Sequence, residues 1–106
     1  MADQRSSLLQ LIVQRVVSVC SPEQIVLFGS AARGNARPDS DLDILIVAES
    51  TKPRWERSAP IYAALSDIPT AMDVVVYTSE EIAEWREVPQ AFVTTAIREG
   101  IVLYEK

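Results

Sequence analysis

The sequence predicts a single α/β (α+β) domain spanning residues 1–106, built on a small mixed β-sheet of at least three strands flanked by helices. Three observations support this prediction. The chain has 106 residues, of which 48% are hydrophobic and 24% charged, as in ordinary globular domains. Short apolar runs rich in β-branched residues alternate with stretches of helical spacing. No repeat, low-complexity tract or linker divides the chain.

The amino-terminal half is expected to contain one helix followed by two strands. Apolar residues at helical spacing predict an amphipathic helix over residues 5–19. Residues 25–29, IVLFG, form a short apolar run that ends in a turn signal, which predicts a buried strand. Residues 35–40, NARPDS, have the composition of a loop. Residues 42–48, LDILIVA, are apolar on both faces and predict a central strand.

A helix and a third strand are expected next. The helical stretch follows Pro53, and Pro60 is expected to kink or divide it. Its apolar residues are Trp55, Ile61, Tyr62 and Leu65. Residues 71–78, AMDVVVYT, predict the third strand.

The last part of the chain is expected to hold two helices and one strand. Ser79, with the two glutamates that follow it, predicts a capped start for the helix SEEIAEWREV. Pro89 is expected to open a final helix, which Gly100 ends. Residues 101–105, IVLYE, predict a short edge strand.

The composition excludes several classes of function. The chain has no histidine, so a Ser-His-Asp triad, a Cys-His pair and a His-ligated zinc site are impossible. The formal net charge is −5 and the basic residues are dispersed, which argues against direct nucleic-acid binding. No apolar run approaches the ~20 residues of a membrane span, so a cytoplasmic protein is expected. The single Cys20 is expected to be a small buried hydrophobe.

Three aspartates form a candidate metal site. Asp41 and Asp43 flank Leu42 at the start of the central strand, so they share one face and lie about 7 Å apart at the backbone. Asp73 interrupts the apolar run of the third strand. Carboxylate oxygens suit magnesium, which binds one or two carboxylates together with substrate phosphates. If the two strands are neighbours, three carboxylates face one point, which is enough for two metal ions.

The turn before these aspartates is a candidate phosphate site. Gly29 lets the backbone approach a ligand closely, and Ser30 adds a hydroxyl to the free backbone amides of the turn. Arg33, about one helical turn later, could reach a phosphate with two hydrogen bonds. Taken singly, each feature is more often a turn, a cap or a solvated charge; their combination on a strand–turn–loop–strand pattern indicates a functional site.

These residues resemble the motif of the nucleotidyltransferase superfamily that includes DNA polymerase beta, and specifically its minimal nucleotidyltransferase (MNT) branch. The motif is Gly-Ser, about ten residues, Asp-x-Asp, and a third carboxylate on a later strand. Here it is carried by Gly29, Ser30, Asp41, Asp43 and Asp73, within FGSAARG, SDLDILIV and MDVVVYT. The resemblance extends over nearly the whole chain, because the terminal AIREGIVLYEK also fits, and it implies the nucleotidyltransferase fold.

The resemblance implies roles for these residues. Gly29 and Ser30 would hold the nucleotide phosphates, while Asp41 and Asp43 would bind two Mg²⁺ ions. Asp73 would complete one metal shell and help to take the proton from the incoming hydroxyl. The reaction implied is attack on the α-phosphate of ATP with release of pyrophosphate.

The resemblance also implies a partner. MNT proteins of this size are typically antitoxins that transfer AMP from ATP to a tyrosine of a HEPN-domain ribonuclease toxin and thereby silence it. Trp55, Trp85 and Phe92 could form a partner surface, although at least two of them are expected to complete the core. Two alternatives remain open at this stage. One is a binding antitoxin that acts by occlusion, and the other is a nucleotidyltransferase that modifies a small molecule such as an aminoglycoside.

Overall fold

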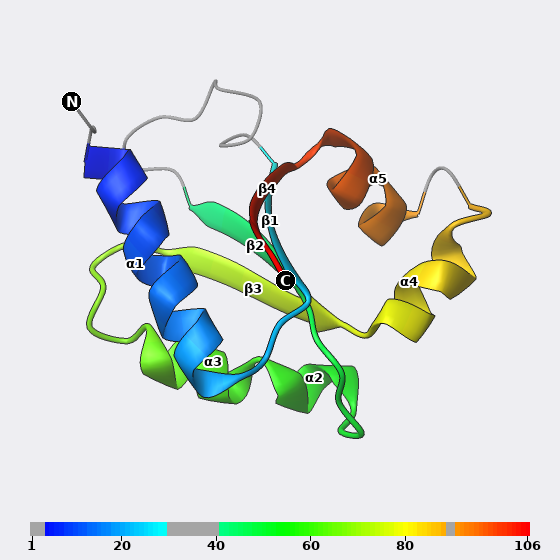
Figure 1. Ribbon diagram of the computed structural model, residues 1–106, viewed down its shortest axis with the longest axis horizontal. Coiled ribbons are helices and arrows are strands. Elements are labelled where there is room, and N and C mark those ends of the chain that lie inside the picture. Colours follow the sequence, from blue (N-terminus) through cyan, green and yellow to red (C-terminus); the bar gives the residue numbers. More distant parts are fainter. Residues whose placement is uncertain (1–3, 30–40, 89–90) are drawn as a thin grey trace.

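Four strands form one mixed sheet in the computed structural model, which describes residues 4–29, 41–88 and 91–106. The strand order is β3-β2-β1-β4, so β3 and β4 are the two edges (Figure 1). The β1–β2 and β1–β4 pairs are antiparallel, whereas β2 and β3 are parallel. The strands are β1 (Gln24–Phe28), β2 (Leu42–Val47), β3 (Met72–Tyr77) and β4 (Ile101–Glu105). The predicted mixed sheet flanked by helices is therefore confirmed.

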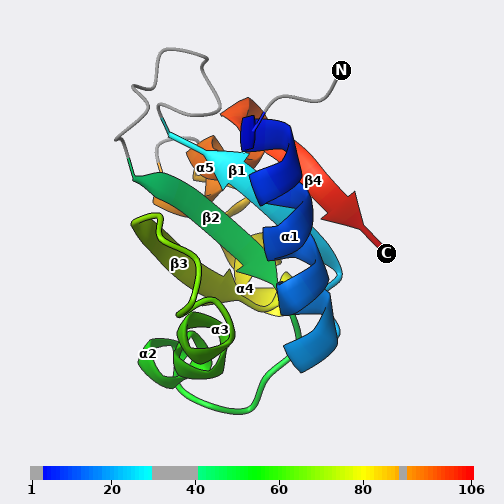
Figure 2. The same cartoon turned by 90° about the vertical axis from the view of Figure 1, so that its left-hand side faces the viewer.

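Helices cover both faces of the sheet. Figure 2 shows α1 in front of the sheet and α4 and α5 behind it, with α2 and α3 next to β3. The helices are α1 (Gln4–Val19), α2 (Arg54–Arg57), α3 (Ala59–Ala64), α4 (Ser79–Trp85) and α5 (Phe92–Glu99). Within these described ranges, no helix combines the length and the apolar character that crossing a membrane requires.

The core has two parts because β2 is apolar on both faces. On one face, Ile44 and Ile46 pack with Ile12 of α1 and Ile61 of α3. On the other face, the buried residues of the second cluster come from β1, β2, β3 and α5. They are Val26, Leu45, Tyr77, Val93 and Ala96. This burial on both sides confirms the central position predicted for residues 42–48.

The boundaries of three helices show how local chemistry decides where a helix begins. The stretch after Pro53 is divided into α2 and α3, which meet at Ser58 just before Pro60, as predicted. The predicted cap of α4 was off by one residue. Thr78 is the cap, because its hydroxyl accepts the Glu81 amide while the Glu81 carboxylate accepts the Thr78 amide. The final helix begins at Phe92, not at Pro89, which lies outside the described residues.

The two tryptophans do not complete the core. The side chain of Trp55 is 77% exposed and that of Trp85 is 42% exposed. Because two of the three aromatic residues are exposed, the expectation that at least two of them complete the core is wrong. The side chain of the third, Phe92, lies outside the described part of the chain. The short helices α2 and α4 contain no buried residue. The indole rings of Trp55 and Trp85 therefore face solvent.

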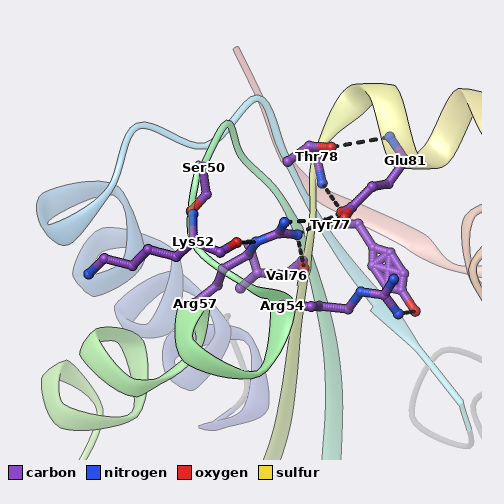
Figure 3. A network of polar contacts seen from close by, with 8 residues as sticks. All are labelled: Ser50, Lys52, Arg54, Arg57, Val76, Tyr77, Thr78 and Glu81. Carbon is purple, nitrogen blue, oxygen red and sulfur yellow. Dashed lines mark hydrogen bonds and ion pairs between the residues drawn. The ribbon is translucent and has the colours of Figure 1, made fainter.

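Polar contacts hold α2 and α4 against β3 (Figure 3). Arg57 of α2 is only 9% exposed, and its guanidinium lies 2.6 Å from the Glu81 carboxylate. That hydrogen bond, together with the amide of Thr78, lowers the pKa of Glu81 to about 2. The guanidinium of Arg54 stacks 4.5 Å from the ring centroid of Tyr77. These contacts fix the outer side of the edge strand β3.

Candidate active site

The parallel pairing of β2 and β3 brings two of the predicted carboxylates side by side. Asp43 and Asp73 are direct register partners in the two strands. Partners on neighbouring strands lie about 5 Å apart at the backbone and project from the same face. That face is the one covered by α4 and α5, because Leu45 and Val75, two positions further along, pack in the second core cluster.

A glycine approaches Asp43 from the other neighbour of β2, strand β1. Phe28, the last residue of β1, pairs with Asp43, and Gly29 follows with a positive φ of 75°. A Cβ atom at Gly29 would collide with Asp43 Oδ2 and lie 3.2 Å from its Cγ. Only glycine therefore allows the chain to turn this close to the carboxylate. Gly29 thus forms the turn predicted at the end of the strand, and its backbone lies against the side chain of Asp43.

The third aspartate, Asp41, stands immediately before β2 and is exposed. Burial raises the pKa of Asp43 above its usual value, and the negative charges of Asp73 and Asp41 raise it further. Asp43 therefore interacts electrostatically with both of the other carboxylates. Negative charge is therefore concentrated at one end of the sheet, although like charges repel one another.

The donor set suits a hard divalent cation. In the described part of the chain, no three acidic or cysteine side chains are gathered tightly enough to hold one metal ion by themselves. Magnesium does not need such a cage, because it is usually held by one or two carboxylates, with substrate phosphates and water filling the rest of its shell. The paired oxygens of Asp43 and Asp73 provide that kind of donor.

Two other predicted site residues, Ser30 and Arg33, lie outside the described residues. They remain predictions from the motif. A further residue close to the site was not anticipated by sequence reasoning. Helical spacing predicts Tyr62 as an apolar residue of a helix, whereas its hydroxyl accepts a hydrogen bond from the Val74 amide at 2.7 Å. Nothing in helical spacing signals such a contact with a distant strand.

One protein-family model matches most of the chain. The family described as "Polymerase beta, Nucleotidyltransferase" matches residues 11–106, which contain all of the site residues discussed above. No curated protein matches the chain. The sequence resemblance to the DNA polymerase beta superfamily is thus supported by a match over most of the chain.

Solved structures show the same fold at low sequence identity. A protein from Sulfolobus solfataricus assigned as a nucleotidyltransferase is 23% identical, with a TM-score of 0.65, covering 94% of this chain and 82% of that one. A toxin–antitoxin crystallised with AMP-PNP is 24% identical, with a TM-score of 0.59 and coverages of 92% and 73%. A mutant of the toxin–antitoxin MntA-HpeT is 20% identical, with a TM-score of 0.56 and the same coverages.

Proposed function

This chain belongs to the polymerase beta nucleotidyltransferase family, and on that basis we propose that it transfers AMP from ATP to a hydroxyl group of a protein. The observation that carries the proposal is the placement of Asp43 beside Asp73, with Gly29 turning against Asp43. This arrangement leaves carboxylates and a closely approaching backbone at one point. Such a combination suits a metal-bound triphosphate, because carboxylates bind the metal and backbone amides bind phosphate oxygens.

The reaction would join the acceptor oxygen to the α-phosphorus of ATP. The bond from that phosphorus to the oxygen bridging to the β-phosphate breaks, and pyrophosphate leaves. Asp73 would accept the proton of the acceptor hydroxyl, while Gly29 and Ser30 would orient the phosphates. Asp41 and Asp43 would hold Mg²⁺, with Asp73 completing the shell of one ion, and the bound metal would neutralise much of the triphosphate charge. This neutralisation reconciles an anionic substrate with a chain of net charge −5.

We propose further that the acceptor is a tyrosine of a HEPN ribonuclease toxin and that the chain acts as its antitoxin. Two of the structures with the same fold are described as toxin–antitoxin structures, and one of them contains AMP-PNP, an ATP analogue. The sequence resemblance to the MNT branch points the same way. Two Mg²⁺ ions per site and a cytoplasmic location belong to the same proposal.

A non-catalytic antitoxin that binds its toxin is the second candidate. The exposed Trp55 and Trp85 favour it, since exposed tryptophans are enriched at the centres of protein interfaces. Occlusion and catalysis are separable, because occlusion does not require the carboxylates of Asp41 and Asp43.

The deciding experiment is the intact mass of the protein from the adjacent reading frame, tested as the candidate toxin, after co-expression with this chain. We expect a mass increase in whole AMP units with the unaltered chain, and none with the double variant Asp41→Asn/Asp43→Asn. Glu80→Gln removes an exposed acid on α4 and serves as the matched control, which should modify the toxin normally.

Each outcome of this experiment leads to a different conclusion. A toxin of unchanged mass that still co-purifies with this chain would replace catalysis by occlusion. A toxin of unchanged mass that does not co-purify would direct the search to small-molecule acceptors.

A further inference from the structure

The strand that carries Asp73 is an edge strand, so no strand among the described residues pairs with the other side of its backbone. Backbone groups of successive residues point alternately to the two sides of a strand. The carbonyls of Ala71 and Tyr77 accept hydrogen bonds from the amides of Leu42 and Ala48. The backbone amides and carbonyls of the odd-numbered residues of β3 therefore point toward β2. The even-numbered residues therefore direct their amides and carbonyls away from the sheet.

Side chains from the segment containing α2 and α3 form hydrogen bonds with this outer edge of β3. The amide of Val74 donates to the hydroxyl of Tyr62 at 2.7 Å, and the carbonyl of Val76 accepts from the Arg57 guanidinium at 3.3 Å. Figure 3 shows the Arg57 contact, together with its ion pair to Glu81. The side chains of Tyr62 and Arg57 thus bind the outer edge of β3. The Tyr62 contact is at Val74, the residue directly after Asp73.

We propose that Tyr62 is a positioning residue for Asp73, an inference that rests on the proposed nucleotidyl transfer. Asp73 is exposed and is the second residue of an edge strand, where a backbone is prone to fray. Its carboxylate keeps its place beside Asp43 only if the peptide that follows it stays in register. The Tyr62 hydroxyl fixes that peptide through the amide of Val74.

Tyr62→Phe removes the hydroxyl and keeps the ring, so it isolates this contact. The Val74 amide then loses its partner, and the start of β3 becomes freer to move. We expect kcat to fall by about 10- to 100-fold, the range typical of losing a contact that orients a metal ligand. The Mg²⁺ concentration at half-maximal rate should rise, whereas KM for ATP should change little, because Gly29 lies on the other side of Asp43.

The matched control is Tyr104→Phe, the same chemical change on the opposite edge strand, where Tyr104 pairs with Ile25. Two measurements do not depend on turnover. Amide hydrogen exchange should accelerate at Val74 in Tyr62→Phe and stay unchanged there in Tyr104→Phe. Calorimetric titration of Mn²⁺ into each protein with AMP-PNP should show weaker ion binding only in Tyr62→Phe, with unchanged circular dichroism in both.

Unchanged Val74 exchange, or Mn²⁺ binding and kcat equal to those of Tyr104→Phe, would overturn the inference. The proposed function fails separately, if the unaltered protein transfers no nucleotide to any acceptor tested. In that case the exchange and ion-binding measurements still decide whether Tyr62 positions Asp73. A uniform fall in melting temperature, with normal ion binding and kcat in the folded fraction, would assign Tyr62 a structural role only and also reject the inference.

Discussion

Gly29→Ala is the substitution that best separates the site from the fold. Gly29 combines a positive φ of 75° with a backbone position that leaves no room for a Cβ atom beside Asp43. The added methyl group would collide with Asp43 Oδ2 and stand 3.2 Å from Cγ, closer than a Cβ atom normally comes. Because the atom in its way belongs to a side chain, we expect the carboxylate to move rather than the strand.

The effects on stability and on activity should differ in size. A left-handed conformation costs an alanine about 1–2 kcal/mol relative to glycine. For a domain of this length, that corresponds to a fall in melting temperature on the order of 10 °C. Moving a catalytic group by about 1 Å can cost on the order of 100-fold in rate. We therefore expect a protein that folds but transfers nucleotide ~100-fold more slowly.

The assay is nucleotide transfer per folded molecule, measured below the melting temperature of each variant. Gly100→Ala is the control, because its Cβ would collide with the Val26 side chain and lie 2.5 Å from the Ala96 carbonyl oxygen and 2.8 Å from that of Leu27, and none of these atoms belongs to the aspartates of the site. It should lower the melting temperature and leave the rate of the folded fraction nearly unchanged. Full activity in Gly29→Ala, at normal Mg²⁺ dependence, would refute the reasoning.

Two further predictions concern charge. Asp43→Asn should raise the melting temperature in EDTA, because burial and the charge of Asp73 raise the pKa of Asp43 and so make its ionised form unfavourable at neutral pH. We expect MgATP to raise the melting temperature of the unaltered protein but not that of Asp43→Asn. A lower melting temperature of Asp43→Asn in EDTA would contradict the first expectation. Glu81→Gln should cost about 2 kcal/mol above pH 5, since it breaks the pair with the buried Arg57, whereas the exposed Glu80→Gln should cost almost nothing. The pKa of Glu81 is lowered from 4.5 to about 2, so this stabilisation is complete above the unfolded value and is lost as the pH falls between these limits. Urea titrations at pH 6 and pH 3 measure it, and an equal cost at both would count against the ion pair.

Most of the fold follows from local patterns in the sequence. Apart from Asp43, the run in residues 42–47 is apolar at both alternating sets of positions, and the strand is buried on both faces as a result. Proline chemistry likewise divides α2 from α3. The cap of α4 was misplaced by one residue although its signal was present: Thr78 precedes Glu81 by three positions, which is the capping-box spacing.

The sequence predicts which residues form the candidate site but not their geometry. The motif singles out Asp43 and Asp73, yet their direct register depends on parallel pairing across two helices, which no local pattern specifies. The role of the Tyr62 hydroxyl could not be foreseen either, because hydrophobic periodicity treats tyrosine as an apolar residue. Exposure of Trp55 was also unpredictable, since a four-residue helix has no reliable buried face.

The two halves of the site differ in how far apart their parts lie along the chain, which bears on the order of folding. Gly29 and Asp43 meet because β1 and β2, which are consecutive strands in the sequence, are antiparallel neighbours. Asp73 joins them only after a crossover through α2 and α3, and β4 must then return to β1 from the far end of the chain. Because long-range pairings close more slowly, the β1–β2 pair, which already holds Gly29 against Asp43, is expected to form before the complete site. Catalytic competence would then be among the last properties acquired during folding.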